Sequence, residues 1–188
     1  MPGYFQTAAA GGAAVALDDV EISILRSLAV QLLELIGPGD AADGDEPADP
    51  LAELFAEGPT RPPQDPALAR LFPDAYEEEA DSSEFRRFTE NDLRTRKRDD
   101  ALAVVRSLDS LSTGGDGGAV LTLAPGQARQ WLGTLNDLRL TMGTRLEVSE
   151  DEDSELYRLP DSDPRKPLVM AYLWLGGLQE SLVETLMP

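Results

Sequence analysis

Residues 85–111 read FRRFTENDLRTRKRDDALAVVRSLDSL and predict a long helix that has a basic start. Thr89 is placed to cap this helix, and Asp92 occupies the capping-box position three residues later. Apolar side chains at helical spacing give an inward face, made of Leu93, Leu102, Val105, Leu108 and Leu111, with Ala101 and Val104 beside them. We therefore expect a helix from Thr89 to about Leu111 that packs this face against other helices.

Six of the sixteen Lys and Arg residues lie within residues 85–98, in a chain whose formal net charge is −19. We call them the basic island; they are Arg86, Arg87, Arg94, Arg96, Lys97 and Arg98. Arginine at this density suits bidentate contact with carboxylates or phosphates, which makes the island a candidate partner-binding surface. The alternative is local pairing with acidic residues of the same stretch, because Glu90 and Asp92 stand at helical spacing from basic residues.

Three further long helices are predicted from apolar periodicity and end signals, over residues 18–36, 125–148 and 167–186. The first has a capping box formed by Asp18 and Glu21 and stops at Gly37. Its apolar residues spread beyond one face, which indicates a central place in a bundle or a subunit interface. In the last helix, Gly176 and Gly177 each cost roughly 1 kcal/mol relative to alanine. Close approach of another helix or of an aromatic ring would explain them.

Shorter elements complete the predicted fold. Residues 4–6 and 13–17 flank paired glycines and predict a small hairpin, residues 120–123 can pair as a strand, and residues 67–72 predict a short helix. Acidic segments at 39–66 and 149–163 predict disordered linkers. The chain is therefore expected to be mainly α: a single helical domain over residues 1–188. Its bundle has about four long helices, a small N-terminal β-hairpin and acidic flexible linkers.

The composition excludes several kinds of chemistry. The chain has no cysteine and no histidine, so it lacks a thiolate nucleophile, an imidazole base and the usual zinc ligands. It shows no GxSxG, P-loop or GxGxxG motif, and we expect no enzyme activity and no cofactor. The N-terminus lacks the pattern of a secretory signal, and no apolar stretch reaches the ~18 residues of a membrane span. A cytoplasmic location without membrane association is expected.

Residues 134–146, TLNDLRLTMGTRL, place polar side chains beside an apolar stripe. We expect a structural polar network made of Asn136, Asp137, Arg139 and Arg145, in which Asp137 bonds an arginine of the basic island. A ligand site is the alternative. The acidic run 150–155 lacks the spacing and central glycine of an EF-hand, so no metal site is expected. Trp131 and Trp174 lie on apolar stripes and are expected in the core.

Two blocks, residues 85–108 and 131–148, resemble the signature segments of an actinobacterial family long described only as a domain of unknown function. The helices predicted at 17–37 and at the C-terminus stand where that family has them. The family includes an AosR-like oxidative-stress transcription regulator that works with an extracytoplasmic-function sigma factor. Redox sensing there is attributed to a cysteine pair, which this chain lacks. Met142 and Met170 could oxidise instead, but both lie on apolar stripes and are expected to be shielded.

The resemblance and the composition together predict a non-enzymatic regulatory protein of transcription or the stress response. It would act through contact with a protein partner, for which a sigma factor and RNA polymerase are the candidates, and a homodimer is a candidate assembly. The net charge of −19 disfavours independent DNA binding, so DNA would be contacted only weakly or indirectly. The alternative is a structural or adaptor oligomer whose basic island is tied up inside the fold.

Overall fold

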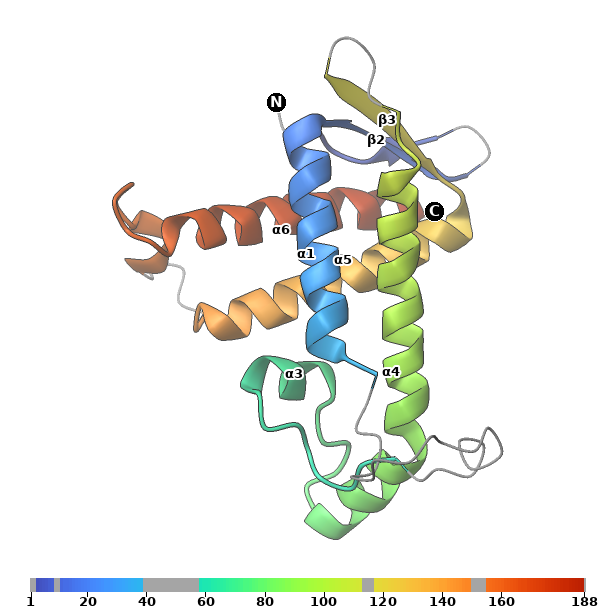
Figure 1. Cartoon of the computed structure of the whole chain (residues 1–188), viewed down its shortest axis with the longest axis vertical. Helices are drawn as coiled ribbons and strands as arrows, with labels where there is room; N and C mark the ends of the chain where they lie inside the picture. Colours follow the sequence, from blue (N-terminus) through green and yellow to red (C-terminus); the bar gives the residue numbers. More distant parts are fainter. Residues whose placement is uncertain (1–2, 9–10, 39–57, 113–116, 150–154, 188) are drawn as a thin grey trace.

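The computed structural model describes residues 3–8, 11–38, 58–112, 117–149 and 155–187, and it is mainly helical (Figure 1). Its helices are α1 (Asp19–Ile36), α3 (Pro66–Leu71), α4 (Glu79–Asp109), α5 (Pro125–Arg145) and α6 (Lys166–Leu186), with a 3-10 turn, η1 (Glu155–Arg158). Three short strands, β1 (Gln6–Thr7), β2 (Ala13–Asp18) and β3 (Gly118–Leu123), form an antiparallel sheet in the order β1-β2-β3. The expected fold class is confirmed, and the predicted hairpin gains β3 as a third strand.

The long helices form two crossing pairs. In Figure 1, α1 and α4 lie side by side and cross the pair formed by α5 and α6, while the sheet lies at one end and α3 near the C-terminal end of α1. The main core lies where the pairs meet and includes Trp131, Leu135, Leu175 and Leu178, each at most 1% exposed. Within the described residues, no helix has the length and apolar character needed to cross a membrane.

The start of α1 matches its prediction. The backbone N–H of Glu21 donates to Asp18 Oδ1 at 2.8 Å, and the N–H of Asp18 donates to Glu21 Oε2 at 2.9 Å, which completes the capping box. The helix ends at Gly37, whose φ of +61° is one that glycine adopts without strain. Both ends of α1 therefore follow from local sequence chemistry.

The start of α4 differs from its prediction. The helix begins at Glu79, not Thr89, and the Thr89 hydroxyl donates back to the Phe85 carbonyl at 2.8 Å within the helix. The predicted inward face is also partly wrong, because Leu93 is 37% exposed. Instead, the N-terminal half of α4 buries Arg86, Glu90 and Arg94. Apolar periodicity misplaces this face because the side chains that it buries are charged.

Gly176 and Gly177 of α6 both lie against a neighbouring side chain, and at Gly177 this neighbour is an aromatic ring, as expected. A Cβ built on Gly177 would lie 3.3 Å from the ring of Tyr4, so an aromatic ring does approach the helix. A Cβ on Gly176 would lie 3.5 Å from Nε of Arg139. The glycines thus make room for one aromatic ring and one guanidinium.

The predicted linkers lie partly outside the described residues, which omit 39–57 and 150–154. In the described part of the first segment, Gly58 donates its N–H to the carbonyl of Arg87 at 2.9 Å. In the second, Leu156 and Leu159 are buried in a small cluster with Leu146 and Val169. This cluster lies at the end of the α5–α6 pair, apart from the main core.

Gly12→Ala is expected to lower the free energy of unfolding by about 1–3 kcal/mol. A Cβ at Gly12 would lie 2.1 Å from the carbonyl oxygen of Leu123, so β2 or β3 must shift to admit it. Gly126→Ala in α5 is the matched control, because a Cβ there meets nothing within 4 Å. It should be neutral or stabilising by up to about 1 kcal/mol. Urea unfolding of both variants measures the difference, and equal stabilities would contradict the packing of β2 on β3.

Candidate functional site

Two arginines of the basic island belong to a buried charge cluster on α4. Arg86, Glu90 and Arg94 follow one another at four-residue spacing, so their side chains lie on one side of the helix. They are 5%, 3% and 6% exposed, respectively. Glu90 accepts a hydrogen bond from Arg86 through one carboxylate oxygen and from Arg94 Nη2, at 2.6 Å, through the other. One carboxylate thus joins two guanidinium groups in the interior.

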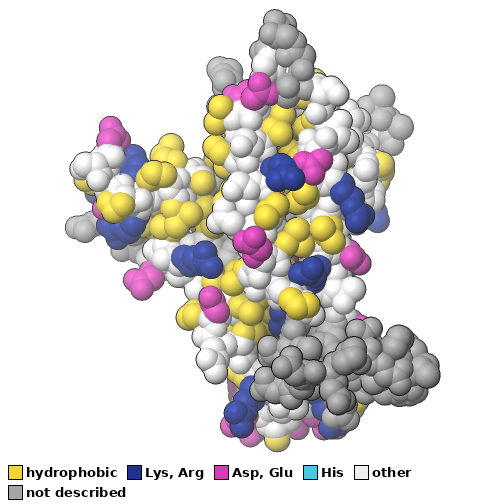
Figure 2. Space-filling view, viewed as in Figure 1, with side chains coloured by type: hydrophobic (Ala, Val, Ile, Leu, Met, Phe, Trp, Pro, Cys, Tyr) yellow, Lys and Arg dark blue, Asp and Glu magenta, His cyan; other side chains and the backbone are white. Residues whose placement is uncertain are grey.

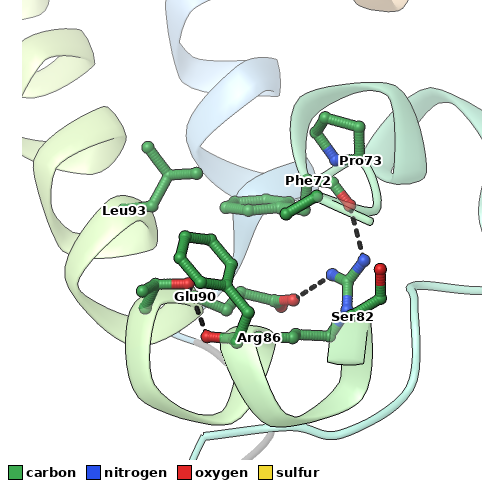
Figure 3. A pocket seen from close by; sticks show the side chains of 9 residues that line it. Phe72, Pro73, Ser82, Arg86, Glu90 and Leu93 are labelled. Atoms are coloured by element: carbon green, nitrogen blue, oxygen red, sulfur yellow. Dashed lines mark hydrogen bonds and ion pairs between the residues drawn. The ribbon is translucent and has the colours of Figure 1, made fainter. Parts of the chain in front are cut away.

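The two arginines also bind the ends of neighbouring elements. Arg86 Nη2 donates to the carbonyl of Phe72 at 3.0 Å (Figure 3). It also donates to Asp74 Oδ1 at 2.8 Å. Arg94 donates to the carbonyl of Ile36 and lies 4.5 Å from the ring centre of Phe72. Ile36 is the last residue of α1, and Phe72 is the C-cap residue of α3. Carbonyls at such helix ends lack helical partners and attract cations. The cluster therefore fastens α4 to both helix ends.

The charges of the cluster stabilise one another. Burial works against the charge of Arg86, but the carboxylates of Asp74 and Glu90 outweigh it and raise the pKa of this guanidinium above its ordinary value. Buried ions are tolerated when they are paired and hydrogen-bonded, and removing one member of such a set is strongly destabilising. Arg86, Glu90 and Arg94 thus serve the fold, and neither arginine is accessible to an outside surface.

The other four residues of the island have different surroundings. Lys97 Nζ lies 2.7 Å from Asp137 Oδ1, and Arg98 Nη1 donates to the carbonyl of Leu33 at 3.1 Å. Arg87 is half-buried, with its guanidinium 4.7 Å from the ring centre of Phe88, and Arg96 is exposed. Lys and Arg side chains are scattered over the face in Figure 2 rather than gathered in one patch. Partner binding by the island stays a prediction. Of its six residues, Arg96 is the one whose side chain is exposed.

The polar residues of α5 make two separate ties. Asp137, 4% exposed, bonds the island through Lys97 rather than through an arginine. Arg139 donates to Gln179 Oε1 at 2.8 Å, and Gln179 in turn donates to Asn136 Oδ1 at 3.4 Å, which links α5 to α6. Arg145 is exposed at the C-terminal end of α5. The four residues therefore do not form one network. Asp137 joins α5 to α4, Asn136 and Arg139 join α5 to α6, and Arg145 takes part in neither tie.

A small cavity lies beside the charge cluster (Figure 3). Its volume is ≈ 50 Å³, and its lining includes Phe72, Phe85 and Leu93 with Ser82 and Arg86. Ligand pockets usually measure about 300–1,000 Å³. The Ser82 hydroxyl already donates to the Tyr76 carbonyl at 2.7 Å, and both Nη atoms of Arg86 are hydrogen-bonded. This cavity has room for water and not for a metabolite.

The described residues also lack a group of three or more His, Cys, Asp or Glu side chains that could hold a metal ion. What sequence reasoning missed at this site is the role of Phe72, Asp74 and Ile36 as partners of the island. Their separation along the chain hides them, whereas the pairing of Glu90 with Arg94 was visible from four-residue spacing. The site is therefore a buried charge cluster that joins α4 to the C-terminal ends of α1 and α3.

Comparison with known proteins places this helical protein in a family. Residues 3–186 match the family model DUF2017, a domain of unknown function, and the chain belongs to that family. Proteins of Mycobacterium tuberculosis (strain H37Rv) and Mycobacterium bovis named "Oxidative stress regulator AosR" are each 33% identical over 183 residues, which cover 89% of this chain and 78% of each relative. A Mycobacterium leprae protein named "Putative oxidative stress regulator AosR" is 30% identical over 181 residues, covering 89% and 79%.

These names support a regulatory role for the present chain, and the predicted family is confirmed. No solved structure is significantly similar to this chain. The relatives thus inform the role, while the geometry of the site comes from this structure.

The carboxyl of Asp137 has a raised pKa because it is buried. Burial raises the pKa of this carboxyl above its ordinary value of 3.8, and the hydrogen bond from Lys97 offsets only part of the rise. The folded state therefore holds a proton that the unfolded chain loses as pH rises past 3.8. This carboxyl contributes stability fully below that value, and the contribution is lost as pH rises through the folded pKa.

Asp137→Asn is expected to remove this pH dependence. The free energy of unfolding of the unchanged protein, minus that of the variant, should fall as pH rises from 3.8 through the folded pKa. Urea unfolding at a series of pH values measures the difference curve. Asp109→Asn is the control of opposite sign, because the hydrogen bond from Arg26 holds the pKa of Asp109 below its usual value. Curves that slope the same way for both residues would contradict the burial argument.

Proposed function

We propose that this protein is a non-enzymatic regulator of the stress response that acts through contact with another protein. The observation that carries the proposal is the similarity to proteins named oxidative stress regulators, which extends over 89% of the chain. The inward bonding of the basic island supports contact with protein rather than nucleic acid, because phosphate binding needs exposed cations. The partner is a component of the transcription machinery, either a sigma factor or RNA polymerase.

The island contributes to such contact only through its accessible members. Arg96 is exposed, and Arg87 and Arg98 are partly so, whereas Arg86 and Arg94 are buried. An acidic partner would therefore meet Arg96 first, since Arg98 donates to the carbonyl of Leu33. Surface pairs of this kind contribute about 0–1 kcal/mol each, so apolar contact must supply most of the affinity.

An oxidative signal cannot act through a thiol within these 188 residues, because the chain has no cysteine. Thioethers are the remaining sulfur groups, and the expectation that both Met142 and Met170 are shielded is wrong for one of them. Met142 is 5% exposed in the core, but Met170 is 55% exposed on α6. Apolar periodicity places Met170 on a helical stripe and cannot show that the stripe faces solvent there.

Dilute hydrogen peroxide is expected to oxidise Met170 well before Met142, since sulfoxide formation follows exposure. Mass spectrometry of peptides from a timed exposure measures both rates. Met187, which is 66% exposed, is the matched control and should react about as fast as Met170. If Met142 reacted at the same rate, the packing around α5 would have to open in solution, contrary to this structure.

Deletion of the gene in the native organism tests the proposed function. Transcript profiles before and after peroxide exposure should differ from those of the parent strain in a defined set of genes, and the intact gene should restore them. Unchanged transcripts, together with the loss of a metabolic conversion, would overturn the proposal. The second candidate function is a structural or adaptor oligomer, which the exposed apolar side chains of α1 and α6 favour. Sedimentation of the purified protein tests it, because an oligomer sediments faster than a single chain.

A further inference from the structure

An apolar groove lies between the N-terminal parts of α1 and α6. Its volume is ≈ 420 Å³; α1 contributes Ile24, and α6 contributes Pro167, Met170 and Trp174. Figure 2 shows hydrophobic side chains gathered over the N-terminal part of α6, beside α1. The start of α4, which carries the charge cluster, lies at the lower end of the molecule in Figure 1, and the N-terminal parts of α1 and α6 lie above it.

The apolar side chains around this groove are unusually exposed. Ile24 is 41% exposed and Met170 is 55% exposed. Neighbouring positions on the same helices continue the surface, since Val20 on α1 is 65% exposed and Leu173 on α6 is 46% exposed. Contiguous exposed apolar side chains, rimmed by polar residues, are typical of surfaces that bind another macromolecule.

The rim of the groove is acidic. Asp18 and Glu21, at the start of α1, line it, and none of its described lining residues is Lys or Arg. Further along α6, Leu173, Glu180 and Glu184 line a second hollow. Arg139 also lines this hollow, and its guanidinium donates to Gln179. Two cations near the start of α6 are engaged elsewhere: Arg165 pairs with Asp163 at 2.9 Å, and Lys166 with Asp161 at 3.0 Å. The groove therefore combines an apolar floor with negative charge.

This charge decides between possible occupants. A second copy of the chain would bring another acidic rim and a net charge of −19 against −19. Anionic lipid and nucleic acid would be repelled for the same reason. A helix with leucine-like side chains on one face and Lys or Arg on the flanks would bury the apolar floor and pair with the rim.

We propose that the α1–α6 groove is the docking site for a basic amphipathic helix of a protein partner. The proposal rests on the proposed function and deepens it by giving the chemistry of the partner. The surface from Met170 to Glu184 covers 15 residues, or about 21 Å of helix, which matches a partner helix of about four turns. Apolar anchors at helical spacing supply the affinity, and the flanking cations set the orientation.

Binding of a synthetic probe to the full chain tests this proposal. The probe is an 18-residue peptide of leucine and lysine whose leucines share one helical face. A scrambled peptide of the same composition is its control, because it keeps the charge and loses the apolar face. Methionine methyl groups, labelled with ¹³C, report the site by NMR: Met170 should shift saturably with the amphipathic peptide, while Met142 in the core should not.

Variants separate the groove from general attraction between opposite charges. Ile24→Glu and Met170→Glu make the chain more acidic, so electrostatics alone predicts tighter binding, whereas a charge on the floor should weaken binding at least about tenfold. Phe88→Glu is the matched control: Phe88 is 63% exposed and belongs to the first half of α4, and this change should not weaken binding. Circular dichroism confirms that each variant is folded.

Three results would overturn the proposal. They are equal affinity for the scrambled peptide, unchanged affinity in both groove variants, and a stable dimer that Ile24→Glu dissociates. The transcript test of the proposed function is independent of all three. A regulatory phenotype without peptide binding refutes the groove alone, and peptide binding without a regulatory phenotype refutes the function alone.

Discussion

Replacing Arg94 with Glu is expected to lower the free energy of unfolding by about 3–5 kcal/mol. The new carboxylate would lie beside Glu90 in the interior, with the two like charges close together. The carbonyl of Ile36, at the end of α1, would also lose its donor. Since small domains are stable by about 5–15 kcal/mol, this single change removes a large share of the whole.

Arg96→Glu is the matched control, two positions further along α4. Arg96 is exposed, so the same chemical change should alter stability by less than about 0.5 kcal/mol. Urea unfolding followed by circular dichroism compares the two variants directly. Similar losses at both positions would mean that Arg94 is not buried in solution and would return it to the candidate partner surface.

This pair of variants also divides the two roles considered for the basic island. If Arg94→Glu destabilises the fold and Arg96→Glu weakens partner binding alone, the island has a structural part and an accessible part. The structural part can be defined by its contacts with Glu90, Phe72, Ile36 and Asp137. A loss of partner binding in the Arg94 variant would then report unfolding and not a lost contact.

Much of the fold could be predicted because its signals are local. The capping box of α1 joins residues three apart, and Gly37 ends that helix through its own φ. The cost of glycine within a helix predicts a close neighbour at Gly177, either a helix or an aromatic ring, and the structure shows that it is the ring of Tyr4. Signals contained within one turn of chain are readable because their partners lie beside them.

The interior face of α4 could not be predicted for the opposite reason. Arg94 meets a carbonyl 58 positions earlier, and Lys97 meets a carboxylate 40 positions later. Charged side chains are normally assigned to the surface, so apolar periodicity predicts that this side of α4 faces solvent. Only the assembled helices reveal that the ends of α1 and α3 supply oxygen atoms where the arginines point.

The apolar stripes of α1 and α6 illustrate the same limit in reverse. Both stripes predict burial, yet Ile24 and Met170 remain exposed because the neighbouring elements cover only part of each helix. The broad apolar surface of α1 predicted either a central place in the bundle or a subunit interface. The structure shows a buried face through Leu25 and Leu32, and an exposed apolar edge beside it.

Trp131→Ala is expected to cost about 3–5 kcal/mol of stability, since a large buried aromatic side chain is removed from the core. Trp131 is 1% exposed and joins three parts of the fold. Its ring meets Phe5 of the N-terminal segment, with ring centres 6.0 Å apart at 71°, and its Nε1 donates to Ser107 Oγ of α4 at 3.0 Å. The lost side chain would therefore loosen α5 from both neighbours, and urea unfolding measures the effect.

Trp174→Ala is the matched control, because the chain has two tryptophans and this one is partly exposed in the α1–α6 groove. It should cost less stability than Trp131→Ala and should weaken binding of the leucine-lysine peptide, since it removes part of the groove floor. Trp131→Phe, which keeps a ring and loses the bond to Ser107, should fall between the unchanged protein and the alanine variant. Equal losses from the two alanine variants would contradict the unequal burial of these rings, and with it the assignment of one to the core and the other to the groove.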